Sequence, residues 1–249
     1  MGLEFKVADL EREIQAIKTI AGDFLVPGAD SILDRSLAEL KAITRRHDGP
    51  FRWTISEDLP VKTRISYGDY MPDSKGSLCV FGQMSFVWEL FPVRSSGTSS
   101  VAKNVELEGL ASTKITIFEG DPLTDEISEL AMWRMEVGDA NAPGSHFHVQ
   151  VMGRDDDLKF PKPLDIPRLP GLFVSPFAVL EFAIAELFQD EWSKHAARPS
   201  SSMAQWRSIQ AKRQENQLKW QLGLLSSTTG SPWASMKRAK PPANLFTAP

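Results

Sequence analysis

The sequence predicts an α+β fold, in which an antiparallel β-meander of four or more strands has one face covered by helices. Three observations lead to this prediction. Apolar residues recur every three to four positions in the first 46 residues and again after residue 175, as in amphipathic helices. Between residues 77 and 152 they alternate with polar residues, as in half-buried strands. Segments rich in Gly, Ser and Pro separate these periodic stretches.

An N-terminal helical pair is predicted over residues 3–20 and 31–46. The apolar residues of the first segment follow a single helical stripe, and the Pro-Gly pair at 27–28 separates the two segments. Asp30 or Ser31 can cap the second helix, because short polar side chains accept hydrogen bonds from the first free backbone N–H groups.

The predicted strands cover residues 77–90, 104–118, 127–137 and 145–152. Short or flexible connections join them in chain order, which is typical of an antiparallel meander. Each strand has one apolar and one polar side, so one face of the sheet must be covered. The single cysteine, Cys79, is interpreted as a small buried hydrophobe rather than a nucleophile, since no base neighbours it in the sequence.

Two long C-terminal helices are predicted after a proline-rich crossover at 155–174. Ser175 and Pro176 form a strong helix start, and one helix is expected over "VSPFAVLEFAIAELFQDEWSKH", up to His195. It is apolar on most sides, so we expect it to be the central core helix. The last helix covers 202–225.

Composition and charge bound the function only broadly. We expect one α+β domain over residues 1–230 and an extended C-terminal tail with no regular element over 231–249. The formal net charge of −4 does not attract nucleic acid, so any such contact would need a local basic patch. No uncharged apolar run reaches 18 residues, and the N-terminus lacks a signal-peptide core. We therefore expect a cytoplasmic protein without a membrane partner.

The stretch "GSHFHVQVMGRDDD", residues 144–157, places two of the four histidines one residue apart in a predicted strand. Residues two apart in a strand share a face, so this strand has one apolar side and one side that carries both imidazoles. If it pairs with 127–137, matching the apolar sides also brings the polar sides together. The outer face of the sheet would then carry a patch of five residues: His146, His148, Gln150, Arg134 and Glu136.

Such a patch can carry chemistry. One histidine could act as a nucleophile or acid–base group while Arg134 neutralises a phosphate. Arg168, held between prolines, could close over the ligand, or could instead be a surface arginine paired with Asp165. The two imidazoles could bind a metal, with Glu136 as the third protein ligand that a catalytic zinc ion usually needs, and the three aspartates at 155–157 could hold a divalent cation with Asp165 nearby. We favour no metal site, because the spacing of the aspartates is not that of a calcium loop and fits a polar turn. The alternative for the histidines is surface decoration or a hydrogen-bonded structural pair.

The seven residues "HFHVQVM" also follow the pattern His-apolar-His-apolar-Gln-apolar-apolar. This strand resembles the signature strand of the histidine-triad superfamily, in the branch whose third histidine is glutamine. The resemblance implies that His148 attacks a nucleotide α-phosphate, with His146 and Gln150 as supporting groups. The approach to the first histidine, "PGS", is shorter here than in that family, and no upstream helix–strand arrangement matches its fold.

Two hypotheses of function follow. The first is a ligand-binding protein, or a hydrolase or transferase, that acts on a phosphorylated or nucleotide-like compound at the His-X-His-X-Gln strand. The second is a non-catalytic interaction subunit of a multi-protein complex, docking through its sheet or through residues 231–249. In these residues Trp233, Leu245 and Phe246 could be anchors for a partner, or they could pack back on their own domain. The sequence leaves open whether the protein is an enzyme and whether it uses a cofactor. In the first hypothesis, the catalytic residues are His148 and His146, and the substrate-binding residues are Gln150, Arg134, Glu136 and Arg168.

Overall fold

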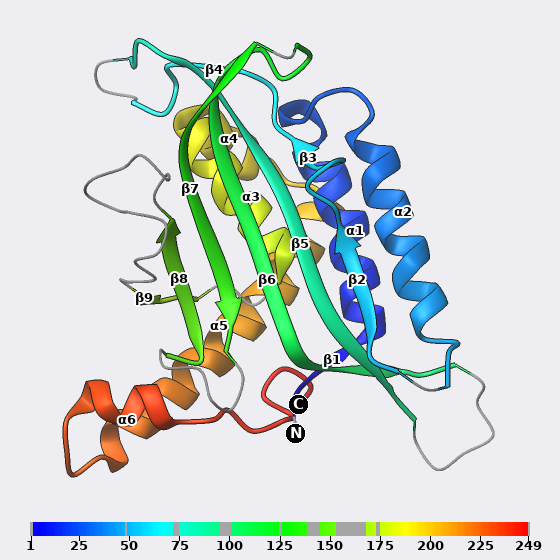
Figure 1. Cartoon of the computed structure of the whole chain (residues 1–249), viewed down its shortest axis with the longest axis vertical. Helices are drawn as coiled ribbons and strands as arrows, with labels where there is room; N and C mark the ends of the chain where they lie inside the picture. Colours follow the sequence, from blue (N-terminus) through cyan, green and yellow to red (C-terminus); the bar gives the residue numbers. More distant parts are fainter. Residues whose placement is uncertain are drawn as a thin grey trace.

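A computed structural model describes residues 2–47, 49–71, 75–94, 101–124, 126–138, 145–152, 168–172 and 175–248. It confirms the predicted α+β class, with an antiparallel sheet in one layer and helices packed behind it (Figure 1). Within the described part of the chain, no helix combines the length and the apolar character needed to cross a bilayer.

The nine-stranded antiparallel sheet has the strand order β2-β5-β6-β7-β8-β9. Its four consecutive strands from β5 to β8 form the predicted meander (Figure 1). Three further strands are short, with β1 paired to β6 and with β3 and β4 paired to β5. The bounds are β1 (Leu3–Lys6), β2 (Phe51–Ile55), β3 (Val61–Lys62), β4 (Ser66–Tyr67), β5 (Cys79–Val93), β6 (Asn104–Gly120), β7 (Ile127–Val137), β8 (Phe147–Met152) and β9 (Arg168–Pro170).

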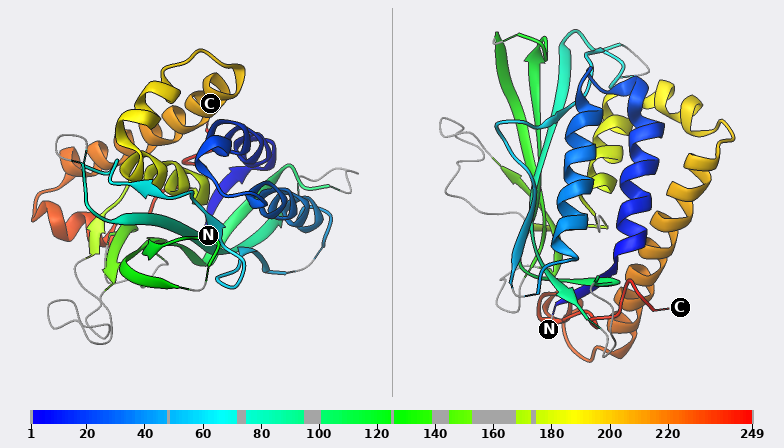
Figure 2. Two further views of the ribbon diagram at one scale, coloured as in Figure 1. Left: turned by 90° about the horizontal axis from the view of Figure 1, so that it is seen from above. Right: turned by 90° about the vertical axis from the view of Figure 1, so that its right-hand side faces the viewer.

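The four main helices α1, α2, α3 and α5 lie on one side of this sheet, and no helix of the described residues covers its other face (Figure 2). The helix α3 packs on β5 and β6, as predicted for the core helix, and α5 packs on α1. The bounds are α1 (Val7–Ala21), a 3-10 turn (Gly22–Phe24), α2 (Ala29–Ile43), α3 (Pro176–Leu187), α4 (Gln189–Ala196), α5 (Ser201–Ser227) and α6 (Pro232–Arg238).

The core forms where the apolar sides of the strands meet these helices. Trp53 of β2 and Phe86 of β5 are edge-on, with ring centroids 4.9 Å apart, and Phe177 of α3 lies 5.9 Å from both rings. The predicted helix start is confirmed, because Ser175 Oγ accepts a hydrogen bond from the backbone N–H of Ala178 at 3.1 Å. This start points α3 across the back of the sheet.

Three local predictions are wrong. Residues 3–6 form a strand rather than a helical turn, because Leu3 and Phe5 pair with β6 and both side chains enter the core. The predicted core helix ends at Leu187, and α4 begins two residues later at Gln189. Cys79 is exposed rather than buried, because it opens β5 at the edge of the molecule, opposite Tyr67.

The C-terminal residues are not an extended tail. Pro232–Arg238 form the helix α6, with the hydroxyl of Ser231 accepting from the backbone N–H of Ala234. Leu245 and Phe246 are then buried in the core, where the Phe246 ring lies 5.2 Å from that of Phe5. Of the two alternatives left open by the sequence, these two residues pack back on their own domain, whereas Trp233 is 44% exposed.

Candidate functional site

The predicted register between the last two long strands is confirmed. Arg134 of β7 lies opposite Gln150 of β8, and Glu136 lies opposite His148. Directly opposed residues of an antiparallel pair share a face, so these four side chains lie together on the outer side of the sheet. The alternate residue Phe147 points into the core, with its ring centroid 5.9 Å from that of Trp220.

His148 is buried and contacts a partner through each ring nitrogen. Its Nδ1 lies 2.8 Å from the backbone oxygen of Ser145, and because a carbonyl only accepts, Nδ1 carries a proton. Its Nε2 lies 3.3 Å from Glu136 Oε2, outside hydrogen-bond geometry, so this contact is chiefly electrostatic. Arg134 Nη1 donates to Glu136 Oε1 at 3.3 Å. A continuous line of contacts therefore runs from Ser145 to Arg134.

The environment of Glu136 favours its charged form. Burial raises the pKa of the Glu136 carboxyl, but the contact with His148 and the positive charge of Arg134 outweigh it, so the pKa lies below its usual value. The carboxylate thus lies between the guanidinium of Arg134 and the imidazole of His148.

His146 lies just before β8 rather than within it, so the expected strand is shorter at this end. Its backbone oxygen accepts from the N–H of Gly138 at 2.6 Å, and its ring is edge-on to Phe147 at 5.1 Å. Arg168 lies in β9 opposite Gln150, which puts its backbone in the same row as the predicted site. The four aspartates considered for a cation, at 155–157 and 165, lie outside the described residues.

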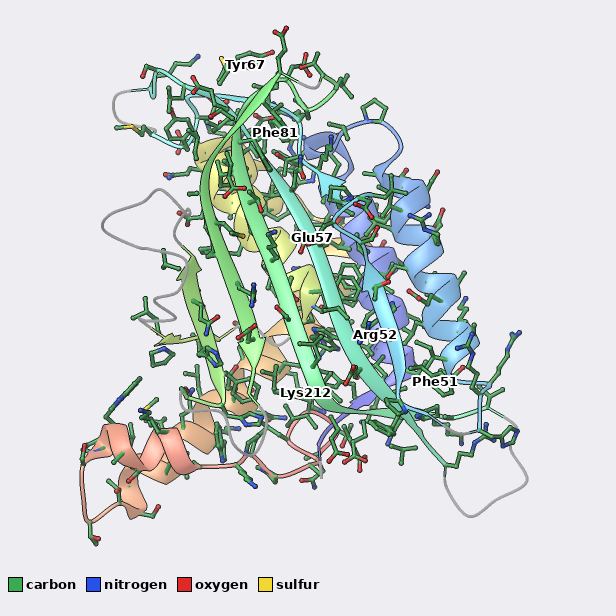
Figure 3. All side chains as sticks on the ribbon, in the orientation of Figure 1. Phe51, Arg52, Glu57, Tyr67, Phe81 and Lys212 are labelled. Atoms are coloured by element: carbon green, nitrogen blue, oxygen red, sulfur yellow. The ribbon has the colours of Figure 1, made fainter. Side chains whose placement is uncertain are left out.

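A hollow of about 370 Å³ lies beside this patch, over β2, β5, β6 and β7. Glu57, labelled in Figure 3, belongs to the segment after β2 and forms a salt bridge with Lys114 at 2.7 Å. The hollow combines hydroxyl groups with charges of both signs. Its hydroxyl-bearing residues are Thr54, Ser56, Ser85 and Ser112, and its charged residues are Glu57, Lys114, Arg134 and Glu136.

The two cations of the hollow are direct neighbours. Lys114 of β6 lies opposite Arg134 of β7, and Ser85 of β5 lies opposite Lys114 on its other side. One row of directly opposed residues therefore runs across β5, β6, β7 and β8, made of Ser85, Lys114, Arg134 and Gln150. In the adjacent row, Ser112 lies opposite Glu136, which lies opposite His148. Together the two rows join the hollow to the predicted histidine patch.

Sequence reasoning identified Arg134, Glu136, His148 and Gln150 but missed Lys114 and the serines beside it. The signal was available in part, since Lys114 stands on the polar side of the alternating segment 104–118. The alternation does not predict the register of β6 against β7, and it is this register that brings Lys114 next to Arg134.

Comparison with models of known protein families, with curated proteins and with solved structures finds no match to this chain. The likeness to the histidine-triad superfamily rests on the strand "HFHVQVM" alone. Among the residues that the structure describes, no group of three or more His, Cys, Asp or Glu side chains is placed to hold a metal ion.

Proposed function

We propose that the outer face of the sheet binds a phosphorylated or nucleotide-like compound, whose phosphate lies between Lys114 and Arg134. The observation that carries this proposal is the direct opposition of these two cations in the hollow. Like charges that face each other across adjacent strands destabilise a sheet unless counter-charges compensate them. Here Glu57 and Glu136 compensate the two cations, and a bound phosphate would take over part of that role.

The surroundings of the two cations suit a phosphate. Glu57 and Glu136 each contact one cation, at 2.7 and 3.3 Å, so neither carboxylate is shared by both. The hydroxyls of Ser85 and Ser112 lie in the rows beside the cations and can donate to phosphate oxygens. The guanidinium of Arg134 presents paired N–H groups that can donate to two phosphate oxygens. The ammonium group of Lys114 adds a compact positive charge.

The geometry supports binding more directly than covalent catalysis by His148. Its Nε2 faces Glu136, so attack on a phosphate would require that contact to break first. A phosphate at Lys114 and Arg134 can leave that contact in place, but it must compete with Glu57 and Glu136 for the two cations. The position of His148 behind Glu136 instead suits a group that fixes the carboxylate and, through it, Arg134.

The alternative of docking through residues 231–249 has lost two of its three anchors. Leu245 and Phe246 lie in the core of their own domain, and the Leu245 backbone oxygen accepts from Asn216 Nδ2 at 3.0 Å. The hollow therefore supports the phosphate-binding function better than the chain end supports the docking function.

Isothermal titration calorimetry tests the proposal, with pyrophosphate, AMP, ADP and a sugar phosphate as probes. We expect at least one probe to bind, and Lys114→Gln or Arg134→Gln to weaken its affinity roughly tenfold or more, because each removes a charge-assisted hydrogen bond. Arg52→Gln is the matched control, since Arg52 is an exposed cation of the same sheet that does not line the hollow (Figure 3).

The outcome is decided by the contrast between these variants. Absence of binding by all probes, or equal affinity in the wild type and in both hollow variants, contradicts the proposal. His148→Gln separates the two chemical hypotheses. If the wild type binds a probe and leaves it unhydrolysed after long incubation, the protein is a binding protein. If the wild type hydrolyses the probe and His148→Gln binds it without hydrolysing it, His148 is catalytic.

A further inference from the structure

The basic residues of the chain are concentrated near its C-terminal end. Residues 201–240 hold seven basic residues and one acidic residue, Glu215, whereas the rest of the chain holds 21 basic and 31 acidic residues. Arg213 is buried. The exposed basic side chains of this segment are Arg207, Lys212, Lys219, Lys237 and Lys240. The helices α5 and α6 therefore present a positive surface on a protein that is acidic elsewhere.

The same helices leave large apolar side chains in solvent. Leu218, Leu222 and Leu225 of α5 are 43%, 61% and 40% exposed, at spacings of four and three residues that define one stripe. A different face of α5, which carries Trp206, Ile209 and Gln217, is buried, so the stripe faces solvent. We call it the leucine stripe.

The second helix continues this surface chemistry. Trp233 of α6 is 44% exposed, and α6 packs against α5. The helix α5 packs on the outer side of α1 (Figure 2), and its Trp220 contacts Phe147 of β8 on the helix-covered side of the sheet. The hollow lies on the other side. The leucine stripe is thus separate from the hollow between the cations, and an inference about it does not depend on the proposed phosphate site.

We propose that α5 and α6 form a peripheral contact with the surface of an anionic lipid bilayer. A helix with an apolar stripe bordered by lysines lies in the plane of the membrane interface, with the apolar residues among the acyl chains and the cations at the headgroups. This proposal departs from the expectation of no membrane partner, which rested on the lack of a spanning segment. A peripheral contact needs none, and no helix of the described residues could span a bilayer.

The charges around the leucine stripe favour this occupant over a second copy of the chain. Lys212 and Lys219 are seven residues apart, so they lie on one side of α5, beside the stripe. Lys219 also contacts Glu215 at 2.6 Å, so its charge is partly compensated in the unbound protein. The long stems of both lysines let the ammonium groups reach lipid phosphates while the leucines insert. A second copy would bring the same cations against each other, which costs free energy. Trp233 suits the headgroup region, because the apolar part of an indole ring can contact the acyl chains while its N–H donates to headgroups or water.

Vesicle co-sedimentation of the full chain tests the proposal, with phosphatidylcholine alone or mixed with phosphatidylserine. We expect sedimentation with the mixed vesicles only, decreasing as salt is added. Lys212→Gln/Lys219→Gln should lower partitioning about 5- to 30-fold, because each basic residue near an anionic surface contributes about a fivefold gain and Glu215 offsets part of the contribution of Lys219. Leu218→Ser/Leu222→Ser should also lower it.

Matched controls carry the same changes elsewhere. Leu123→Ser replaces an exposed leucine of the β6–β7 turn, and Arg52→Gln replaces an exposed cation of the sheet, so neither should alter partitioning. All these positions are exposed, and far-ultraviolet circular dichroism verifies each fold. If a leucine variant does not fold, the lysine variant and the salt series still decide the matter.

Two results overturn the proposal. One is the absence of sedimentation with the mixed vesicles, or equal partitioning of all variants. The other is tight binding of a soluble polyanion, poly-glutamate or duplex DNA, that is lost in the lysine variant while vesicles are not bound. That result assigns the surface to an acidic protein or to nucleic acid instead.

Discussion

Glu13 Oε2 lies 2.6 Å from Arg213 Nη1, and both side chains are almost completely removed from solvent. The ion pair joins α1 to α5 across 200 residues of chain. Glu13 Oε1 also accepts hydrogen bonds from Gln210 Nε2, at 2.6 Å, and from the hydroxyl of Ser175. A single buried carboxylate therefore connects α1, α5 and the start of α3, which are the elements behind the sheet.

Removing the positive partner of this pair should destabilise the protein strongly. Arg213→Met leaves the Glu13 charge buried without its counter-ion, and we expect the free energy of unfolding to fall by about 3–5 kcal/mol. Equilibrium unfolding in guanidinium chloride measures the change. The control Lys219→Met breaks an exposed pair with Glu215 and should change stability by less than about 1 kcal/mol.

A double variant separates the charge effect from lost packing. Glu13→Gln/Arg213→Met removes both charges but keeps an amide oxygen that can accept from Ser175 and Gln210, so it should be more stable than Arg213→Met alone. If the double variant is the less stable of the two, the cost of the single change comes from lost packing against Phe5, whose ring centroid lies 5.4 Å from the guanidinium carbon.

The sequence predicted those helices and strands that are long enough for the spacing of their apolar residues to show a period. The four long strands alternate over many residues, and one face of each must enter the core, so periodicity alone identifies them. The strands β3 and β4 have two residues each, too few to show a period. Glu13 stands on the same side of α1 as Leu10 and Ile17, and nothing in that segment marks it as buried, because its partner is in α5.

The candidate site shows the same limit. The core-facing side of β7 and β8 fixes their register, so the sequence could place Glu136 beside His148. The hollow also requires β5 and β6, whose pairing shifts between Trp88 and Leu90, while β6 and β7 shift between Ile117 and Phe118. Such irregularities follow from packing of the whole sheet rather than from local alternation.

The contact between His148 and Glu136 should appear in the acid dependence of stability. The pKa of Glu136 is lower in the folded chain than its usual value near 4.3, so its ionised form stabilises the fold above about that pH and this contribution is lost as the pH falls through the lowered pKa. In His148→Leu, the pKa of Glu136 should rise, and stability should fall less steeply on acidification than in the wild type.

Carbon-13 NMR titration of the Glu136 carboxyl, together with urea unfolding at several acidic pH values, measures both effects. His47→Leu is the control for loss of a titrating imidazole, because His47 is exposed near the end of α2. An unchanged Glu136 titration in His148→Leu would show that the imidazole does not stabilise the carboxylate.

Glu181 should respond to pH in the opposite direction. Burial raises its pKa, the hydrogen bond donated by Trp206 Nε1 at 2.7 Å lowers it, and the negative charge of Glu13 raises it, with an upward net shift. The protonated form is thus favoured in the folded chain, and its contribution to stability is lost as the pH rises through the raised pKa. Glu181→Gln should gain stability relative to the wild type between pH values of about 4 and 7, since the amide still accepts from Trp206.

Thermal unfolding of both proteins across this range measures the difference. Glu215→Gln is the contrasting control, because the pKa of Glu215 is lowered by its hydrogen bond to Lys219, so this variant should gain no stability as the pH rises. A constant stability difference between Glu181→Gln and the wild type at all pH values would contradict a raised pKa for Glu181.

Phe246, four residues from the end of the chain, should contribute to stability as a core residue does. Its ring lies 5.2 Å from that of Phe5 and 6.0 Å from that of Phe147, so it packs between β1 and β8. Phe246→Ala should lower the free energy of unfolding by about 3 kcal/mol or more, through lost burial and the cavity left behind. Trp233→Ala, at a half-exposed aromatic of the same C-terminal region, should change it by less than about 1 kcal/mol.

Chemical denaturation of the two variants distinguishes an integrated chain end from a detached one. Because Phe147 immediately precedes His148, loss of Phe246 should also loosen the start of β8, and hydrogen exchange of the backbone N–H groups in this strand should accelerate. Equal and small effects of both substitutions on stability would mean that the last residues do not hold β8 in place. The contact between His148 and Glu136 would then depend only on its own sheet neighbours.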